Sequence, residues 1–251
     1  MRTLKAVSFD VGWTLTYPIE SMWEIYARLC TESGVPTTAA DCEQLVRSLW
    51  SSGQEQAHER FRNGASYSDS DAEFAGLFVQ MSHMIFGRAG LGERLAELSQ
   101  RFFEAFWNEG TWQLFPDTIE VLRELRARGL RVGVLSNAPS NLRDMLEHFG
   151  LLPHLDFAVI SAIEGVKKPD RRIFERVLER AGVAPHEVLH VGDMFLEDVA
   201  GAGAAGIHSL LIERGERSLF PSFPESAGRS LPPGAVVRTL RDVVRAIDEQ
   251  G

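Results

Sequence analysis

Short apolar runs alternate with amphipathic helical patterns along most of the chain. Runs of strand length occur at residues 4–9, 130–135, 157–161, 187–191 and 208–212. A helical pattern precedes the second run, and Pro116 suits the first turn of this helix while Gly129 suits its end. Another helical pattern ends at Gly182. Parallel strands need a crossover connection, and helices usually supply it. The alternation therefore predicts an α/β fold with one parallel sheet.

The stretch from about Tyr17 to about Trp112 lacks this alternation and shows only helical patterns. Its Met and aromatic stripes are typical of helix packing rather than of a ligand site. The stripes run from Ile19 to Leu29, from Leu45 to Trp50, from Phe74 to Ile85 and from Leu95 to Phe106. We therefore predict an α/β core domain made of residues 1–16 and 112–251, interrupted by a helical domain at 17–111.

Composition and charge narrow the class of protein. Hydrophobic residues make up 44% and charged residues 24%, which is typical of a globular chain and not of a disordered or membrane-embedded one. The net charge of -9 argues against binding nucleic acid or an anionic membrane surface. Cys30 and Cys42 are too few for a disulfide framework and are predicted to be packed thiols. We expect a cytoplasmic protein with a small-molecule substrate; the sequence does not indicate its oligomeric state.

Polar residues follow several of the predicted strands. Asp10, Ser136 and Asp193 each stand at a strand end, and Lys168 lies in the loop after another strand. Ligands of parallel sheets bind beyond the carboxyl ends of the strands. We therefore expect these four side chains to converge on one edge of the sheet.

Four motifs resemble those of the haloacid dehalogenase-like hydrolase superfamily, in the family's order and spacing. They are Ser-Phe-Asp10-Val-Gly-Trp-Thr14-Leu, Leu-Ser136-Asn137, Gly-Val-Lys-Lys168-Pro-Asp and Val-Gly-Asp193-Met-Phe-Leu-Glu-Asp198. The similarity covers residues 1 to about 16 and about 112 to 212. It implies a Rossmann-like sheet, and it makes the insertion similar to the helical cap of the subclass that contains small-metabolite phosphatases, phosphomutases and dehalogenases.

The residue types fit covalent catalysis beside a cation. A carboxylate at a strand end can attack an electrophile, which suits Asp10. Asp193 and Asp198 would approach Asp10, and three crowded carboxylates repel one another unless a cation neutralises them. Mg²⁺ prefers such oxygen ligands. The resemblance implies that Asp10, the backbone carbonyl of Gly12 and Asp193 bind the ion, while Asp198 orients the site from behind.

The remaining motif residues would hold a phosphoryl group. Ser136, the backbone amide of Asn137 and the ammonium of Lys168 would contact its oxygens and spread its charge. The family pattern places the functional lysine directly before proline, so Lys168 is chosen as catalytic over Lys167. Thr14 is assigned to substrate binding. The sequence thus predicts a magnesium-dependent phosphatase of small phosphorylated metabolites that acts through an aspartyl-phosphate on Asp10.

The first motif departs from the family pattern at Gly12. The phosphatase motif is Asp-x-Asp-Gly-Thr, and its second Asp protonates the departing alkoxide and deprotonates the attacking water. A positioned general acid or base contributes about 10²–10⁴-fold, so alkyl phosphates should react slowly here. Trp13 also replaces a small residue, which changes the entrance of the site.

Two alternatives follow from this departure. A 2-haloacid dehalogenase also lacks the second Asp, although that branch works without metal and without the Gly-Asp-x4-Asp pattern of Asp193 and Asp198. A binding or regulatory protein with little turnover is the other alternative, motivated by Gly12 together with Trp13.

Several further residues are assigned structural roles. His190 lies inside a strand and is predicted to be an interior histidine with satisfied hydrogen bonds rather than a base. The stretch Gly201 to Gly206 matches the dinucleotide fingerprint but follows a helical segment instead of a strand, so we assign it to close packing. A solvated helix face is preferred over a site role for four residues of the insertion, which are His58, Arg60, Arg62 and His83.

Overall fold

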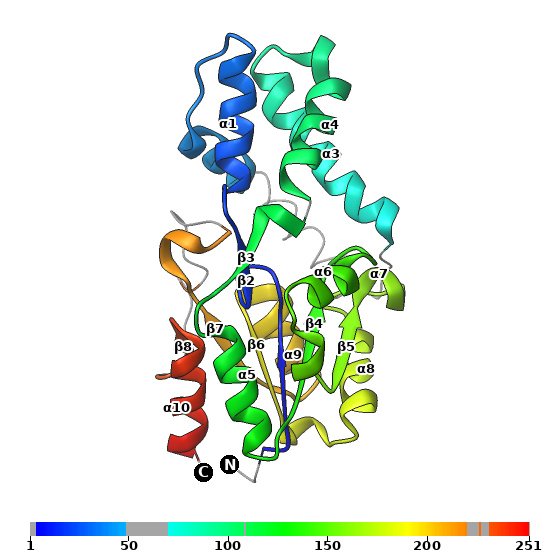
Figure 1. The fold of residues 1–251 in the computed structure, drawn as a ribbon, viewed down its shortest axis with the longest axis vertical. Coiled ribbons are helices and arrows are strands. Elements are labelled where there is room, and N and C mark those ends of the chain that lie inside the picture. Colours follow the sequence, from blue (N-terminus) through cyan, green and yellow to red (C-terminus); the bar gives the residue numbers. More distant parts are fainter. Residues whose placement is uncertain (1–3, 49–69, 108, 220–225, 227–230, 251) are drawn as a thin grey trace. The chain divides into compact units, whose positions relative to one another are not determined.

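The chain forms two compact units in the computed structural model, which describes residues 4–48, 70–107, 109–219, 226 and 231–250 (Figure 1). The first unit comprises Met1–Tyr17, Ser68–Ser70 and Leu114–Gly251, and the second comprises Pro18–Tyr67 and Asp71–Gln113. The first unit is therefore discontinuous in the sequence, and each unit is described by itself below.

The first unit is built on a six-stranded parallel sheet in the order β5-β4-β1-β6-β7-β8. The strands are β1 (Ala6–Phe9), β4 (Arg131–Ser136), β5 (Phe157–Ile160), β6 (Val188–Gly192), β7 (His208–Ile212) and β8 (Val236–Val237). Each predicted apolar run is one of these strands, and its ends differ from the prediction by no more than two residues. The predicted α/β fold with a parallel sheet is confirmed.

Helices cover this sheet. They are α5 (Thr118–Ala127), α6 (Leu142–His148), α7 (Ser161–Glu164), α8 (Arg171–Ala181), the π-helical turn Phe195–Ala200, α9 (Gly201–Ala204) and α10 (Leu240–Gln250). Gly129 and Gly182 end their helices in the left-handed conformation, as predicted. The expectation for Pro116 was wrong, because α5 is capped by Asp117 and Pro116 therefore precedes the helix.

The core on one face of the sheet is formed by apolar residues of the strands and of α8 and α9. Strand residues Ala6, Leu135 and Val159 pack there against Phe174. Position 201 has no room for a side chain, because a Cβ there would lie 2.8 Å from the Phe174 ring. The glycine-rich stretch thus serves close packing at Gly201, as the sequence indicated.

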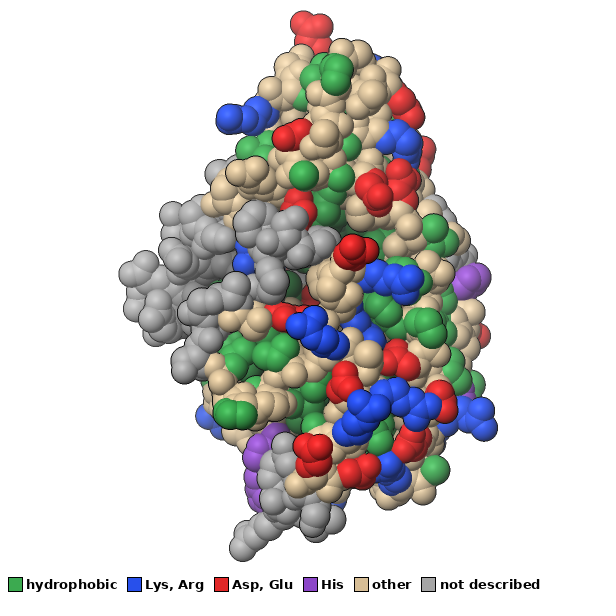
Figure 2. All heavy atoms as spheres, turned by 90° about the vertical axis from the view of Figure 1, so that its left-hand side faces the viewer, with side chains coloured by type: hydrophobic (Ala, Val, Ile, Leu, Met, Phe, Trp, Pro, Cys, Tyr) green, Lys and Arg blue, Asp and Glu red, His purple; other side chains and the backbone are tan. Residues whose placement is uncertain are grey.

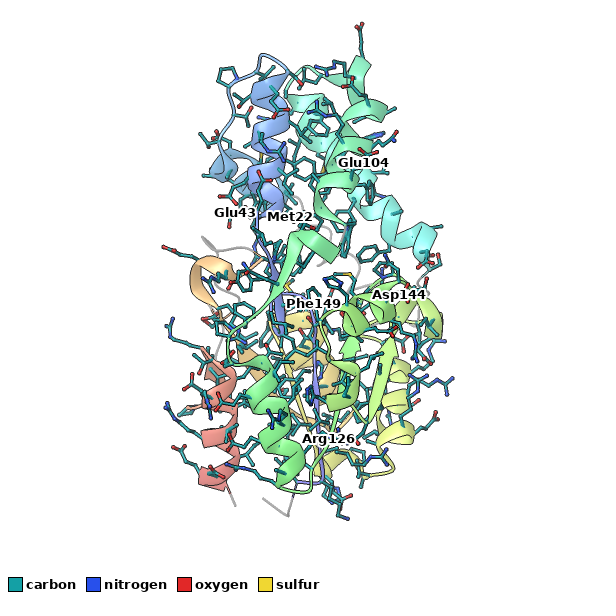
Figure 3. All side chains as sticks on the ribbon, in the orientation of Figure 1. Met22, Glu43, Glu104, Arg126, Asp144 and Phe149 are labelled. Carbon is teal, nitrogen blue, oxygen red and sulfur yellow. The ribbon has the colours of Figure 1, made fainter. Side chains whose placement is uncertain are left out.

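Helices α5 and α10 lie side by side (Figure 1). Arg128, which directly follows α5, forms ion pairs with Glu124 and with Asp248 of α10. Arg241 of α10 also forms an ion pair with Glu124. Figure 2 shows acidic and basic side chains interspersed on this face. Arg126, labelled in Figure 3, joins α5 to Asp156 just before β5.

The second unit is helical, with α1 (Met22–Glu32), a helix at 39–48, α3 (Asp71–Arg88) and α4 (Leu95–Phe106). Ser21 and Glu24 form a capping box that starts α1. The Tyr26 ring stacks on Phe102 at a centroid distance of 4.0 Å. These rings fill the core of the unit, which agrees with the predicted packing role of the stripes. Cys30 and Cys42 are buried free thiols, also as predicted.

Two details of the insertion were predicted wrongly. Ile19 lies before α1 and is 62% exposed, so it does not belong to the apolar face of that helix. The strands β2 (Thr16–Pro18) and β3 (Trp112–Leu114) form a two-stranded sheet where no strand was expected. Leu49 and Trp50 lie outside the described residues. No helix in the described part of the chain has the length and hydropathy needed to cross a bilayer.

Candidate active site

Strand register brings the predicted polar residues to one edge of the sheet. The residue before Asp10 pairs with Val134 of β4 on one side and with Val191 of β6 on the other. Ser136 ends β4 and Asp193 directly follows β6, so both lie at the same carboxyl edge as Asp10. The side chains of all three are largely shielded from solvent.

The loop after Asp10 is a single tight turn. The N–H groups of Leu15 and Thr16 both donate to the carbonyl of Val11, at 2.9 and 3.0 Å. Trp13 has a φ of 54°, a left-handed conformation that costs a non-glycine residue about 1–2 kcal/mol. The turn fixes the backbone around Gly12, the residue whose carbonyl was predicted to bind a metal.

Lys168 joins two carboxylates inside the first unit. Its ammonium donates to Asp10 Oδ1 at 2.7 Å and to Asp198 Oδ1 at 2.6 Å, and also reaches the carbonyl of Leu135 at 3.3 Å. The three side chains are only 2%, 10% and 1% exposed for Lys168, Asp10 and Asp198. The Lys168 ammonium therefore holds both Asp10 and Asp198, to which the sequence analysis assigned different roles.

The charges in this cluster shift each other's pKa values. Burial lowers the pKa of the Lys168 ammonium, but the carboxylates of Asp10 and Asp198 outweigh it and hold the pKa above its ordinary value. Burial raises the pKa of Asp198, yet Lys168 and His190 together bring it well below the ordinary range. The pKa of Asp10 is raised by burial, with Lys168 opposing the shift. Lys168 and Asp198 are therefore charged at neutral pH.

The side chain of Asn137 ties the second motif to the third and fourth. Its Oδ1 accepts from the backbone N–H of Lys168 at 2.8 Å, and its Nδ2 donates to the Lys168 carbonyl at 3.0 Å. The same Nδ2 donates to Glu197 at 3.0 Å. The sequence assigned only the backbone amide of Asn137, so this role of its side chain was missed.

Glu197 is a further residue that the sequence reasoning missed. Burial, together with the nearby charges of Asp198 and Asp10, raises its pKa to about 7 even though Lys168 opposes the shift. The signal was present in the fourth motif, because Glu197 directly precedes Asp198, but only its contact with Asn137 shows where its carboxylate points.

The hydroxyl of Thr14, predicted to bind substrate, is fully buried and has no hydrogen-bond partner within the described part of the chain. The Thr14 carbonyl accepts from Arg214 at 2.6 Å, and the Arg214 guanidinium lies 3.9 Å above the Phe115 ring. Arg214 therefore supports the first-motif loop from outside the four motifs. Substrate binding by Thr14 stays a prediction.

His190 is fully buried and both of its ring nitrogens have partners, as the sequence predicted. Of the insertion residues considered for a site role, His83 is exposed on α3. The other three, His58, Arg60 and Arg62, lie outside the described residues.

The residues at the sheet edge suit a magnesium ion in their chemistry. Asp10 and Asp198 both contact the single ammonium of Lys168, and Asp193 is buried at the same edge of the sheet, so carboxylates outnumber ammonium groups among these residues. No group of three metal-binding side chains occurs among the described residues. Mg²⁺ commonly takes only one or two carboxylates and completes its shell with water and substrate phosphate. Asp10, Asp193 and the Gly12 carbonyl, the ligands that the resemblance implies, would therefore be enough protein ligands for such an ion.

These motifs and the fold belong to a known class of enzymes. The family model of haloacid dehalogenase-like hydrolases matches residues 4–206, and the chain is a member of that family of hydrolases.

Two relatives and one solved structure are similar over large parts of the chain. The human haloacid dehalogenase-like hydrolase domain-containing protein 3 is 29% identical over 98% of this chain and 94% of its own length. The phosphoserine phosphatase of Thermus thermophilus is 37% identical over 62% of this chain and 59% of its own length. The HAD-hydrolase YfnB of Bacillus subtilis, solved bound to magnesium, has a TM-score of 0.67 at 18% identity and covers 98% of this chain and 100% of its own. Its likeness concerns the fold.

Proposed function

We propose that the protein is a magnesium-dependent phosphatase of small phosphorylated metabolites, with Asp10 as its nucleophile. The observation that carries the proposal is the buried arrangement of Asp10, Lys168 and Asp198 at the carboxyl edge of the sheet. The similarity to a phosphoserine phosphatase over 62% of the chain supports a phosphate ester as the substrate class.

Lys168 orients the nucleophile. The ammonium of Lys168 donates a hydrogen bond to Oδ1 of Asp10, which leaves Oδ2 as the attacking oxygen. Oδ2 forms a bond to phosphorus, the bond from phosphorus to the leaving oxygen breaks, and that oxygen departs with the electron pair. Water then attacks phosphorus of the aspartyl-phosphate, and the bond between phosphorus and Oδ2 breaks with its electron pair staying on Oδ2. The carboxylate of Asp10 is thereby restored, and the protons of the water go to the released inorganic phosphate and to solvent.

The phosphoryl oxygens would be held by groups from two motifs. Ser136 ends β4, the backbone N–H of Asn137 follows it, and the ammonium of Lys168 lies between the carboxylates of Asp10 and Asp198. A magnesium ion bound by Asp10, Asp193 and the Gly12 carbonyl would add positive charge where the phosphoryl group develops negative charge. Asn137 would have two roles, because its backbone N–H would contact the phosphoryl group and its side chain fixes the backbone of Lys168.

Gly12 determines which substrates react well. Because residue 12 has no side chain, it cannot protonate a departing alkoxide, so the leaving oxygen must be stable as an anion. Aryl and acyl phosphates meet this requirement, whereas alkyl phosphates do not. We therefore expect a steep fall of kcat/KM as the basicity of the leaving group increases.

A panel of aryl, acyl and alkyl phosphates, assayed with magnesium and with a chelator, tests the proposal. Asp10→Asn should lose at least about 10³-fold in kcat, since it removes the nucleophile. Asp144→Asn on α6 makes the same chemical change at an exposed position and should leave kcat unchanged. Gly12→Asp should increase turnover of alkyl phosphates by about 10²–10⁴-fold. Equal rates for all leaving groups, or an unaffected Asp10→Asn protein, would reject the proposal.

A 2-haloacid dehalogenase is the second candidate, favoured by Gly12 alone. In that reaction Asp10 would attack carbon and halide would leave without a proton, so no second Asp is needed. Halide release that persists in chelator, together with no phosphatase activity, would favour this candidate.

A further inference from the structure

The side chain of His190 lies inside the sheet, in contact with polar groups on both sides. His190 is part of β6. Its Nδ1 lies 2.8 Å from Ser8 Oγ of the neighbouring strand β1, and its Nε2 lies 2.9 Å from Asp198 Oδ1. The Phe174 ring meets the imidazole edge-on at 5.7 Å. The ring therefore has a fixed orientation, and its partners come from three separate parts of the sequence.

The protons on the His190 ring follow from what its partners can accept. Asp198 is a charged carboxylate and can only accept, so Nε2 must carry the proton and donate. In a neutral imidazole Nδ1 is then an acceptor, and the Ser8 hydroxyl donates to it. Ser8 thus selects the tautomer of His190 that can bond to Asp198.

The carboxylate of Asp198 is held at both oxygens. Oδ1 accepts from His190 and from the Lys168 ammonium, and Oδ2 accepts from the backbone N–H of Met194 at 2.9 Å. Gly192 closes the remaining space, because a Cβ there would lie 2.1 Å from Asp198 Cγ. The position of this carboxylate in turn sets where Lys168 meets Asp10.

We propose that Ser8 and His190 are positioning residues, which hold Asp198 and through it fix the Lys168 ammonium against Asp10. The chain of contacts runs from Ser8 through His190, Asp198 and Lys168 to Asp10, and all five side chains are buried. The kinetic consequences rest on the proposed phosphatase function, but the geometric claim does not.

The test compares His190→Leu, His190→Gln and Ser8→Ala with the parent protein. Glutamine carries an N–H near the place of Nε2 and can still donate to Asp198, whereas leucine cannot. His190→Leu should lower kcat by about 10–100-fold with little change in KM, and His190→Gln should restore most of kcat. His208→Leu on β7 is the matched control and should behave like the parent.

A second readout does not need activity. In ¹⁵N NMR spectra of the parent, His190 should show the neutral tautomer with the proton on Nε2, and the buried Lys168 ammonium should give a resolved signal protected from exchange. His190→Leu should lose that protection and His190→Gln should keep it. Ser8→Ala removes one hydroxyl and should make the His190 tautomer pattern less uniform, with a smaller loss of kcat than leucine causes.

The outcomes separate the two proposals. A parent without phosphatase activity would reject the proposed function, while the Lys168 signal in the variants would still decide the positioning role. A folded His190→Leu protein with parental kcat and an unchanged Lys168 signal would overturn that role. If His190→Leu fails to fold, equal kcat, tautomer and Lys168 signals in Ser8→Ala and the parent overturn it instead.

Discussion

Lys168 lies between two buried carboxylates, so its removal tests how the site is held together. In Lys168→Met the apolar atoms of the side chain are largely kept, but Asp10 and Asp198 lose the cation that contacts them at 2.7 and 2.6 Å. Asp198 retains donors from His190 and from the backbone of Met194. Asp10 is therefore the carboxylate that is left uncompensated.

The expected loss of stability follows from burial. Removing one partner of a buried ion pair costs about 3–5 kcal/mol. Because Asp198 keeps other donors, we expect the lower end, a decrease of about 3 kcal/mol in the free energy of unfolding at pH 7. Burial already raises the pKa of Asp10, and the variant lacks the ammonium that opposes this. As the pH falls through that raised pKa, the folded variant takes up a proton before the unfolded chain does, so the loss becomes smaller.

Urea unfolding at several values between pH 5 and pH 8, with chelator present, measures this effect. Lys167→Met is the matched control, since it removes the neighbouring, half-buried lysine and should cost less than about 1 kcal/mol. The double variant Lys168→Met with Asp10→Asn should recover most of the loss, because it removes the uncompensated charge. A loss under about 1 kcal/mol at pH 7, or one that is the same at pH 5 and pH 8, would refute the reasoning.

Three further predictions concern single residues. Gly192→Ala should cost about 1–3 kcal/mol because its Cβ overlaps Asp198, whereas Gly203→Ala, with open space around it, should not destabilise; thermal unfolding compares them, and equal effects would contradict this. Glu197→Gln removes a carboxyl whose pKa of about 7 makes the parent lose stability between about pH 4.5 and 7. With chelator present, the free energy of unfolding of the variant should therefore exceed that of the parent by up to about 3 kcal/mol at pH 8 and should equal it at pH 4.5. A difference in unfolding free energy that does not change with pH would contradict this prediction. Ser21→Ala should cost about 1 kcal/mol by breaking the capping box of α1, measured by urea unfolding, and an unchanged midpoint would speak against the cap.

The strands of the sheet could be predicted because buried parallel strands read as apolar runs between helical patterns. The positions of Asp10, Ser136 and Asp193 followed from the same runs, since each stands where a run ends. The strands β2 and β3 escaped notice, because three residues are too few to show a periodicity. Pro116 was predicted to lie in the first turn of its helix but lies just before the N-cap residue Asp117, because propensity alone does not distinguish these two positions.

The contacts within the site could not be read from the sequence. The pairing of Ser8 with His190 joins residues 182 positions apart, and only the completed sheet brings them together. The side chains of Asn137 and Glu197 look ordinary in isolation, and their common contact depends on how the loop before α8 meets the turn after β6. Asp198 was given a supporting role from the resemblance, while the structure shows that its carboxylate contacts the Lys168 ammonium on one side and the His190 ring on the other.

The discontinuity of the first unit has a consequence for how the chain is assembled during synthesis. Ala6 of β1 is made first, yet its partners on the two neighbouring strands are Arg131 and Val188. At about 5–20 residues per second, β1 waits roughly ten to forty seconds before β6 is complete. The helical unit, by contrast, ends at Gln113 and is fully synthesised before β4 begins. Since domains generally fold as units, the inserted helices are the first part of the protein able to fold, and β1, the strand that precedes Asp10, is among the last to be enclosed.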